Sequence, residues 1–240
     1  MEKKGFEYVP VKERPITEAR DFPYVIDDVA WARKHGYGTD VERDLAELRR
    51  TDPNQRYFRD LPADQREAAL KAANGPQPWS MTAKAPDGML FERSPEGCRS
   101  EAERELYGDL EKWFQAKVTV DTLAEIKRTR VIADPRFTEA VKSWASCMRA
   151  VGHRYSSPIE LRATFSPANK SLPRSKEISL AVAEAKCAIS SGLARTASER
   201  DAHYAEKLQE QHQSHIEIQR KLQLSALPHA RSIVKRSPST

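Results

Sequence analysis

The side chains best suited to chemistry are scattered along this chain. His212 and His215 lie three residues apart, so on a helix they would share a face and could clamp a metal ion. No carboxylate or cysteine completes such a site at a close, well-defined spacing, and we interpret the pair as solvated or interfacial. The adjacent Asp27 and Asp28 are better explained as charges at a helix start than as an acid–base couple.

The usual signatures of nucleophilic and nucleotide chemistry are missing. No serine lies in a G-x-S-x-G elbow, and no segment matches a P-loop or a G-x-G-x-x-G loop. Trp31, Trp113 and Trp144 lie in apolar helical contexts, so we expect them to pack in a core rather than to form a sugar-binding platform. We therefore predict no catalytic residue, no cofactor and no metal site, and keep a hydrolase with an unrecognised site as an alternative.

The three cysteines are Cys98, Cys147 and Cys187, and no two of them form a C-x-x-C pair. The common zinc and redox spacings are therefore absent. In a reducing compartment all three would be ordinary thiols. In a secreted chain the odd number indicates a missing partner or a free thiol.

Composition limits the partners and the compartment. Hydrophobic residues make up 39% of the chain and charged residues 31%, which predicts a thin core under much polar surface. Three of the five excess positive charges of the formal net charge of +5 lie in the last fourteen residues, and the mixed charges of the rest of the chain leave only +2, so we expect no nucleic-acid partner. The chain contains no run of about 18 apolar residues, so we predict no membrane-spanning helix. No apolar segment follows the N-terminal lysines, so a true start at Met1 predicts a cytoplasmic protein.

The pattern of helix starts and breaks predicts an all-α fold of irregular helices. We expect an irregular N-terminal segment over 1–26, one helical domain over 27–226 with long C-terminal helices, and a disordered basic tail over 227–240. A small β-hairpin is predicted near 79–92, because large apolar residues flank the turn signature Pro-Asp-Gly at 86–88.

Two helical segments stand out. Asp134-Pro135 opens the clearest one, in which Phe137, Val141, Trp144, Met148 and Val151 follow the spacing of one buried stripe. Residues 174–226 form the longest helical stretch, which we expect to break at the Ser-Ser-Gly of 190–192. The helices after that break are the predicted surface for a protein partner, whose identity the sequence leaves unknown.

Residues 144–158 carry a more specific pattern, W-x-x-C-M-x-x-x-G-x-x-Y. It resembles a widespread family of uncharacterised actinomycete proteins that are exported or lipid-anchored. Further segments are similar in the same order: a helical hairpin over 54–70, a "GC…EA…LYG" helix over 97–108 and an "AVA…C" helix over 181–187. The resemblance implies export and structural cysteines, but no reaction. This chain departs from the family in that it shows no export signal.

The leading hypothesis is therefore a non-enzymatic helical protein of the actinomycete cell envelope or of the secreted fraction. The alternative is a cytoplasmic module that binds a protein partner through its C-terminal helices. Residues 1–10 repeat the pattern that ends the helix at Met148 and Gly152, so we predict that the chain is N-terminally truncated. It would then be extracytoplasmic, and Cys98 would pair with an upstream cysteine.

The remaining two cysteines form a disulfide candidate. Cys147 lies beside Trp144 and Met148 on a predicted buried helix, and Cys187 lies on a helix rich in alanine, which allows close approach. We expect these helices to pack together with Cys147 facing Cys187. Two separately buried thiols are the alternative that the sequence leaves open.

Overall fold

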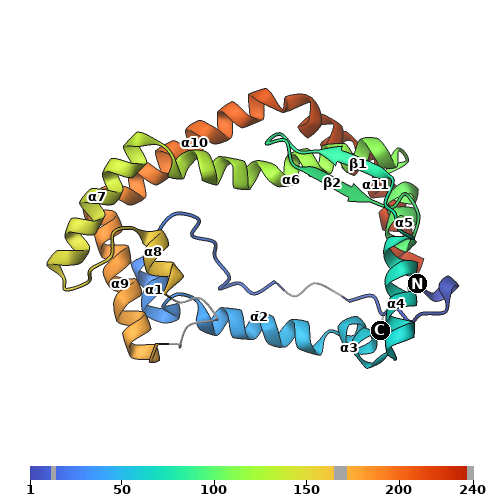
Figure 1. Ribbon diagram of the computed structural model, residues 1–240, viewed down its shortest axis with the longest axis horizontal. Coiled ribbons are helices and arrows are strands. Elements are labelled where there is room, and N and C mark those ends of the chain that lie inside the picture. The colour runs from blue at the N-terminus through green and yellow to red at the C-terminus, as the bar shows by residue number, and fades with distance from the viewer. Residues whose placement is uncertain (12–14, 165–171, 237–240) are drawn as a thin grey trace. The chain divides into compact units, whose positions relative to one another are not determined.

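The computed structural model describes residues 1–11, 15–164 and 172–236 (Figure 1). It is all-α apart from one two-stranded hairpin, as the sequence predicted. None of the described helices combines the length and the apolarity that a membrane span requires. In chain order the elements are η1 (Glu2–Lys4), α1 (Val29–His35), α2 (Thr39–Thr51), α3 (Pro53–Asp60), α4 (Ala63–Asn74), β1 (Met81–Lys84), β2 (Leu90–Arg93), α5 (Cys98–Tyr107), α6 (Leu110–Ile132), α7 (Pro135–Ala150), α8 (Pro158–Ala163), α9 (Arg174–Ser190), α10 (Leu193–Gln211) and α11 (Gln213–Arg236).

The chain forms two compact units, not the single domain expected over 27–226. The first unit comprises 1–11, 50–126 and 208–240, and the second comprises 12–49 and 127–207. The helices α2, α6 and α10 each have residues in both units. The expectation failed because an uninterrupted helical pattern does not indicate that the two parts of one helix pack in different cores.

Local capping signals explain where several helices begin. The side chains of Asp52, Asp134 and Ser157 each accept a hydrogen bond from a backbone N–H of the helix that follows, and a proline stands at the start of each of those helices. Proline is tolerated there because its missing N–H would have no partner within the helix. The expected break at 190–192 is also present, between the end of α9 at Ser190 and the start of α10 at Leu193.

The first unit is built around the hairpin and α6, which Figure 1 shows together with α5. Strands β1 and β2 are antiparallel, with Met81 opposite Arg93 and Ala83 opposite Phe91. Met81 and Ala83 are buried in one cluster with an apolar face of α6, which includes Trp113. The hairpin predicted near 79–92 is therefore confirmed, and it covers this part of α6.

A close backbone approach joins α4 to α5 within the first unit. A Cβ atom added to Gly97 would lie 2.3 Å from the backbone nitrogen of Gly75, a distance that real side chains do not tolerate. Gly97 also has a φ of +92°, a conformation that other residues adopt only under strain. Glycine at this position therefore permits the packing of α5, which begins at Cys98.

The second unit packs α7 against α9 and α1 against α9. Phe137, Trp144 and Met148 are buried in its core, as the stripe predicted, but Val151 is 53% exposed. Val151 departs from the stripe because α7 ends at Ala150 and Val151 caps it. The segment over 1–26 has no long regular element, but residues 24–26 are buried and do not run across the surface.

The expected disordered tail over 227–240 is wrong as far as Arg236. Helix α11 continues through Pro228 to Arg236, while residues 237–240 lie outside the described residues. Tertiary contact overrides the tail's composition here. Ala226 is buried, α11 packs against α5, and the His229 ring nitrogen Nε2 lies 3.3 Å from a carboxylate oxygen of Glu105 on α5.

Candidate ligand-binding site

The histidine pair considered as a metal clamp does not form one in the structure. His212 lies in the turn between α10 and α11, and His215 lies in the first turn of α11. Within the described part of the chain, no three His, Cys, Asp or Glu side chains gather closely enough to hold a metal ion. The interpretation of this pair as solvated or interfacial stays a prediction.

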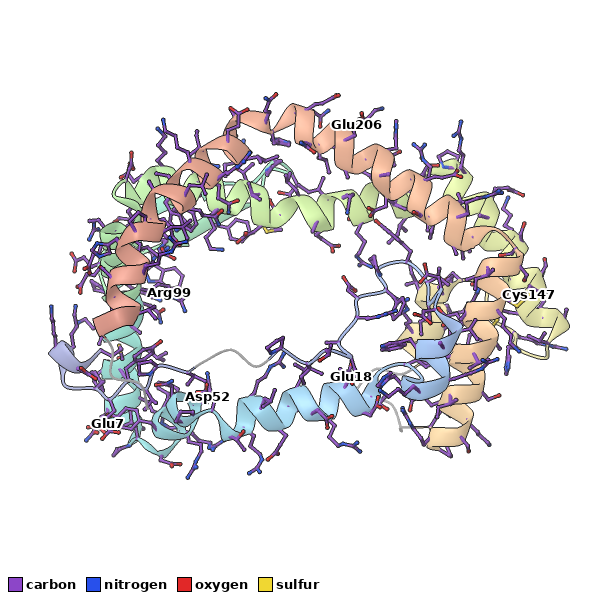
Figure 2. All side chains as sticks on the ribbon, turned by 180° about the vertical axis from the view of Figure 1, so that it is seen from behind. Glu7, Glu18, Asp52, Arg99, Cys147 and Glu206 are labelled. Atoms are coloured by element: carbon purple, nitrogen blue, oxygen red, sulfur yellow. A yellow bond between two sulfur atoms is a disulfide. The ribbon has the colours of Figure 1, made fainter. Side chains whose placement is uncertain are left out.

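Cys147 and Cys187 form a disulfide that joins α7 to α9 (Cys147 is labelled in Figure 2). Their Cα atoms lie 5.6 Å apart, which is within the usual range for a bridge. Cys187 is 2% exposed and belongs to the core of the second unit, beside Ala188 and Trp144. Cys98, at the start of α5, is a free, half-buried thiol.

Two glutamates on α9 are buried in the second unit, and the sequence analysis missed both. Glu184 is fully buried, and its carboxylate accepts hydrogen bonds from the backbone N–H of Ile26 at 3.1 Å and from the Tyr37 hydroxyl at 2.6 Å. Burial raises the pKa of Glu184, because removing a carboxylate from water disfavours its charged form. The Arg162 guanidinium, at 4.0 Å, opposes that shift.

Glu177 lies two turns before Glu184 and is equally enclosed by partners. Its carboxylate accepts from the backbone N–H of Tyr37 at 2.8 Å and from the Thr39 hydroxyl at 2.8 Å, and it pairs with Arg174 at 3.2 Å. A Cβ on Gly36 would lie 2.7 Å from this carboxylate, so the approach requires glycine. The two glutamates of α9 therefore bind the residues that flank α1. Neither carboxylate is left free to contact a substrate.

The signal for these glutamates was present in the sequence. Glu177 and Glu184 are seven residues apart, so they share one face of a helix, and Leu180, Ala181 and Ala188 lie around that face. Acidic residues within an apolar stripe indicate buried carboxylates that need partners. The hydrogen-bond donors from residues 26, 37 and 39 lie 138 to 158 residues away, which the sequence alone does not reveal.

A cavity of about 530 Å³ lies within the first unit, between the hairpin, α5 and α6. Its apolar wall comes from Trp79, Phe91, Phe114 and Val118. Trp79 is 40% exposed, whereas Phe114 and Val118 are buried at the base of the hairpin. The remaining lining residues are polar or charged: Asn74, Glu92, Arg93, Arg99, Glu103, Lys117, Asp121 and Thr122.

Most of the charges around this cavity are paired with one another. Arg93 forms an ion pair with Glu103 and donates to the Ser100 hydroxyl at 2.7 Å. Its guanidinium also lies 5.4 Å from the centre of the Phe114 ring. Lys117 pairs with Asp121 one turn further along α6. These contacts leave Arg99 (labelled in Figure 2) as a lining cation without an ion-pair or hydrogen-bond partner among the described residues.

The chemistry available in the cavity favours binding over catalysis. The lining side chains of the described residues include no histidine, cysteine or serine, so a nucleophile paired with a basic imidazole is not present there. An apolar wall with a few convergent polar groups is typical of a ligand-binding pocket. The sequence analysis treated residues 79–92 only as a hairpin, and it did not identify Arg99.

Comparison with known proteins gives no assignment to set beside this geometry. No family model, no curated protein and no solved structure matches the chain.

Proposed function

We propose that this chain is a non-enzymatic, disulfide-bridged helical protein of an oxidising compartment outside the cytoplasm. The observation that carries the proposal is the bridge between Cys147 and Cys187, which lies in the core of the second unit. Disulfides persist in secreted and cell-surface proteins, whereas cytosolic thiols are kept reduced. A role in the actinomycete cell envelope agrees with the exported family that the W-x-x-C-M motif resembles.

The disposition of the carboxylates supports a role without catalysis. Glu177 and Glu184 accept hydrogen bonds from groups of their own chain. Glu103 and Asp121, which line the cavity, are each held by a neighbouring cation. Carboxylates held in this way stabilise the fold and are poorly placed to exchange protons with a substrate.

Thiol trapping in the source cells tests this proposal. The cells are quenched in acid, and the denatured chain is treated with a mass-tagged maleimide before and after reduction. We expect peptide mapping to find no tag on Cys147 or Cys187 before reduction and a tag on each after it, with the chain in the extracytoplasmic fraction. A Cys98→Ser variant is the matched control and should leave the tagging of these two cysteines unchanged. Tags on Cys147 and Cys187 before reduction, or a cytoplasmic location, would refute the proposal.

One observation favours a second candidate, a module that binds a protein through its C-terminal helices. Leu224, Leu227 and Val234 are 55%, 45% and 72% exposed and lie within one face of α11. A photo-crosslinking residue at Leu227 should form one discrete adduct in the source cells, and the same residue at the exposed Gln213 should not. Equal labelling from both positions would refute this candidate.

A further inference from the structure

We propose that the cavity of the first unit binds an organic carboxylate with a flat apolar body. The cavity lies entirely within the first unit, so the inference does not depend on the disulfide or on the compartment. It goes beyond the proposed function because it assigns a ligand class to this cavity.

The apolar part of the ligand follows from the wall of the cavity. Trp79, Phe91 and Phe114 present three aromatic side chains to a space of about 530 Å³, which is within the usual size of small-molecule sites. Trp79 is 40% exposed although it is large and apolar, so a flat ligand placed against it would remove apolar surface from water. A small inorganic ion would leave this wall uncovered.

The charge of the ligand follows from the ion pairs. Arg93 is held by Glu103, and Lys117 is held by Asp121, so these four side chains contribute little net charge. Arg99 lines the same cavity and has no such partner among the described residues. Its planar guanidinium can donate two parallel hydrogen bonds to a carboxylate, a geometry that a lysine ammonium does not offer.

The one lining acid outside these pairs does not offset Arg99. On β2, side chains alternate between the two faces of the hairpin. Phe91 and Arg93 lie opposite the buried Ala83 and Met81, whereas Glu92 lies opposite the exposed Thr82. This alternation directs the side chain of Glu92 to the face of the strand opposite Phe91 and Arg93.

A cationic ligand is disfavoured for the same reasons. Aromatic side chains can enclose an organic cation, but the guanidinium of Arg93 already lies 5.4 Å from the Phe114 ring centre. A second cation would be repelled by Arg93 and by Arg99. Asn74 also lines the cavity, its side-chain amide has no hydrogen-bond partner among the described residues, and it adds a donor for the carboxylate.

The first arm of the test uses three probes on the full chain. Calorimetric titration with 2-naphthoate should give saturable binding with one site, weakened by added salt. The neutral isostere 2-naphthamide should bind at least about tenfold more weakly, since it lacks the charge that Arg99 would contact. Inorganic phosphate should show no saturable binding, because it lacks the apolar body. Equal binding of the acid and the amide, or no binding of the acid at millimolar concentration, would overturn the proposal.

The second arm uses matched arginine variants. Arg99→Gln should weaken 2-naphthoate binding by at least about tenfold and leave 2-naphthamide binding unchanged. Arg66 lies on the exposed side of α4 and forms no ion pair or side-chain hydrogen bond with the described residues, so Arg66→Gln should leave both affinities unchanged. Thermal melts monitored by circular dichroism confirm that each variant is folded. An Arg99→Gln chain that is folded and binds 2-naphthoate as tightly as the wild type would overturn the assignment of Arg99.

Discussion

Removing the bridge between Cys147 and Cys187 should destabilise the second unit by an amount that follows from the loop it closes. The two cysteines are 40 residues apart. In the chain-entropy treatment, a loop of that length stabilises the folded chain by about 4 kcal/mol at 25 °C, because the cross-link restricts the unfolded state. The bridge joins α7 to α9 within one core, so the full effect should appear in the unfolding of that core.

The shift in melting temperature depends on how much of the chain unfolds together. The second unit has about 120 residues, and its unfolding entropy near the midpoint is about 0.25 kcal/mol/K. A loss of about 4 kcal/mol then lowers Tm by about 16 °C if the unit unfolds alone. If all 240 residues unfold in one transition, the same loss lowers Tm by about 8 °C.

Thermal melts monitored by circular dichroism measure this shift in the Cys147→Ala/Cys187→Ala double variant. Reduction of the wild type should give a similar loss while keeping both side chains, which separates the effect of the cross-link from that of a cavity at the buried Cys187. Cys98→Ser is the control and should melt within about 2 °C of the wild type, since Cys98 forms no bridge. A reduced wild type that melts within about 2 °C of the oxidised chain would refute the reasoning.

Three further predictions concern buried charge, backbone approach and the C-terminal helix. Because burial raises the pKa of Glu184 above its usual 4.5, the folded chain binds more protons than the unfolded one above that pH, and stability falls as pH rises towards the folded pKa. In urea unfolding, the free energy of unfolding of Glu184→Gln minus that of the wild type should therefore be larger at pH 7.5 than at pH 5. The same difference at both pH values would contradict this. Gly97→Ala should cost about 3 kcal/mol or more, against about 1 kcal/mol for Gly88→Ala, which has a similar φ but open space around it. Ending the chain after Leu227 should move Tm by no more than about 2 °C, since residues 228–234 are exposed or half-buried and the contact of His229 with Glu105 is itself solvent-exposed, and a drop of about 10 °C would show that their packing contributes several kcal/mol.

Much of the fold was predictable because its determinants are local. Asp134-Pro135 and Ser157-Pro158 place a capping side chain beside a tolerated proline, so the starts of α7 and α8 follow from adjacent residues. The Pro-Asp-Gly turn predicted the hairpin in the same way. The spacing of Phe137, Trp144 and Met148 also predicted which face of α7 is buried, because that face depends only on the helical period.

Contacts between distant residues decided the rest. Glu103 lies four residues after Arg99 on α5, a spacing that indicates an ion pair within the helix. In the structure, Glu103 instead forms an ion pair with Arg93 of the hairpin. Arg99 is therefore left without an ion pair among the residues that the structure describes. Likewise, the composition after residue 227 indicated disorder, and packing of α11 against α5 made it helical.

The sequence by itself therefore determined the capped helix starts, the break at 190–192, the hairpin and the buried face of α7. Only the tertiary structure decided the division into two units, the partners of Glu177 and Glu184, and the charge that the cavity leaves free. The physical reason is the range of the interactions. A cap, a turn or a helical period acts over about four residues, whereas a buried carboxylate or an ion pair takes whichever partner the folded chain brings within reach.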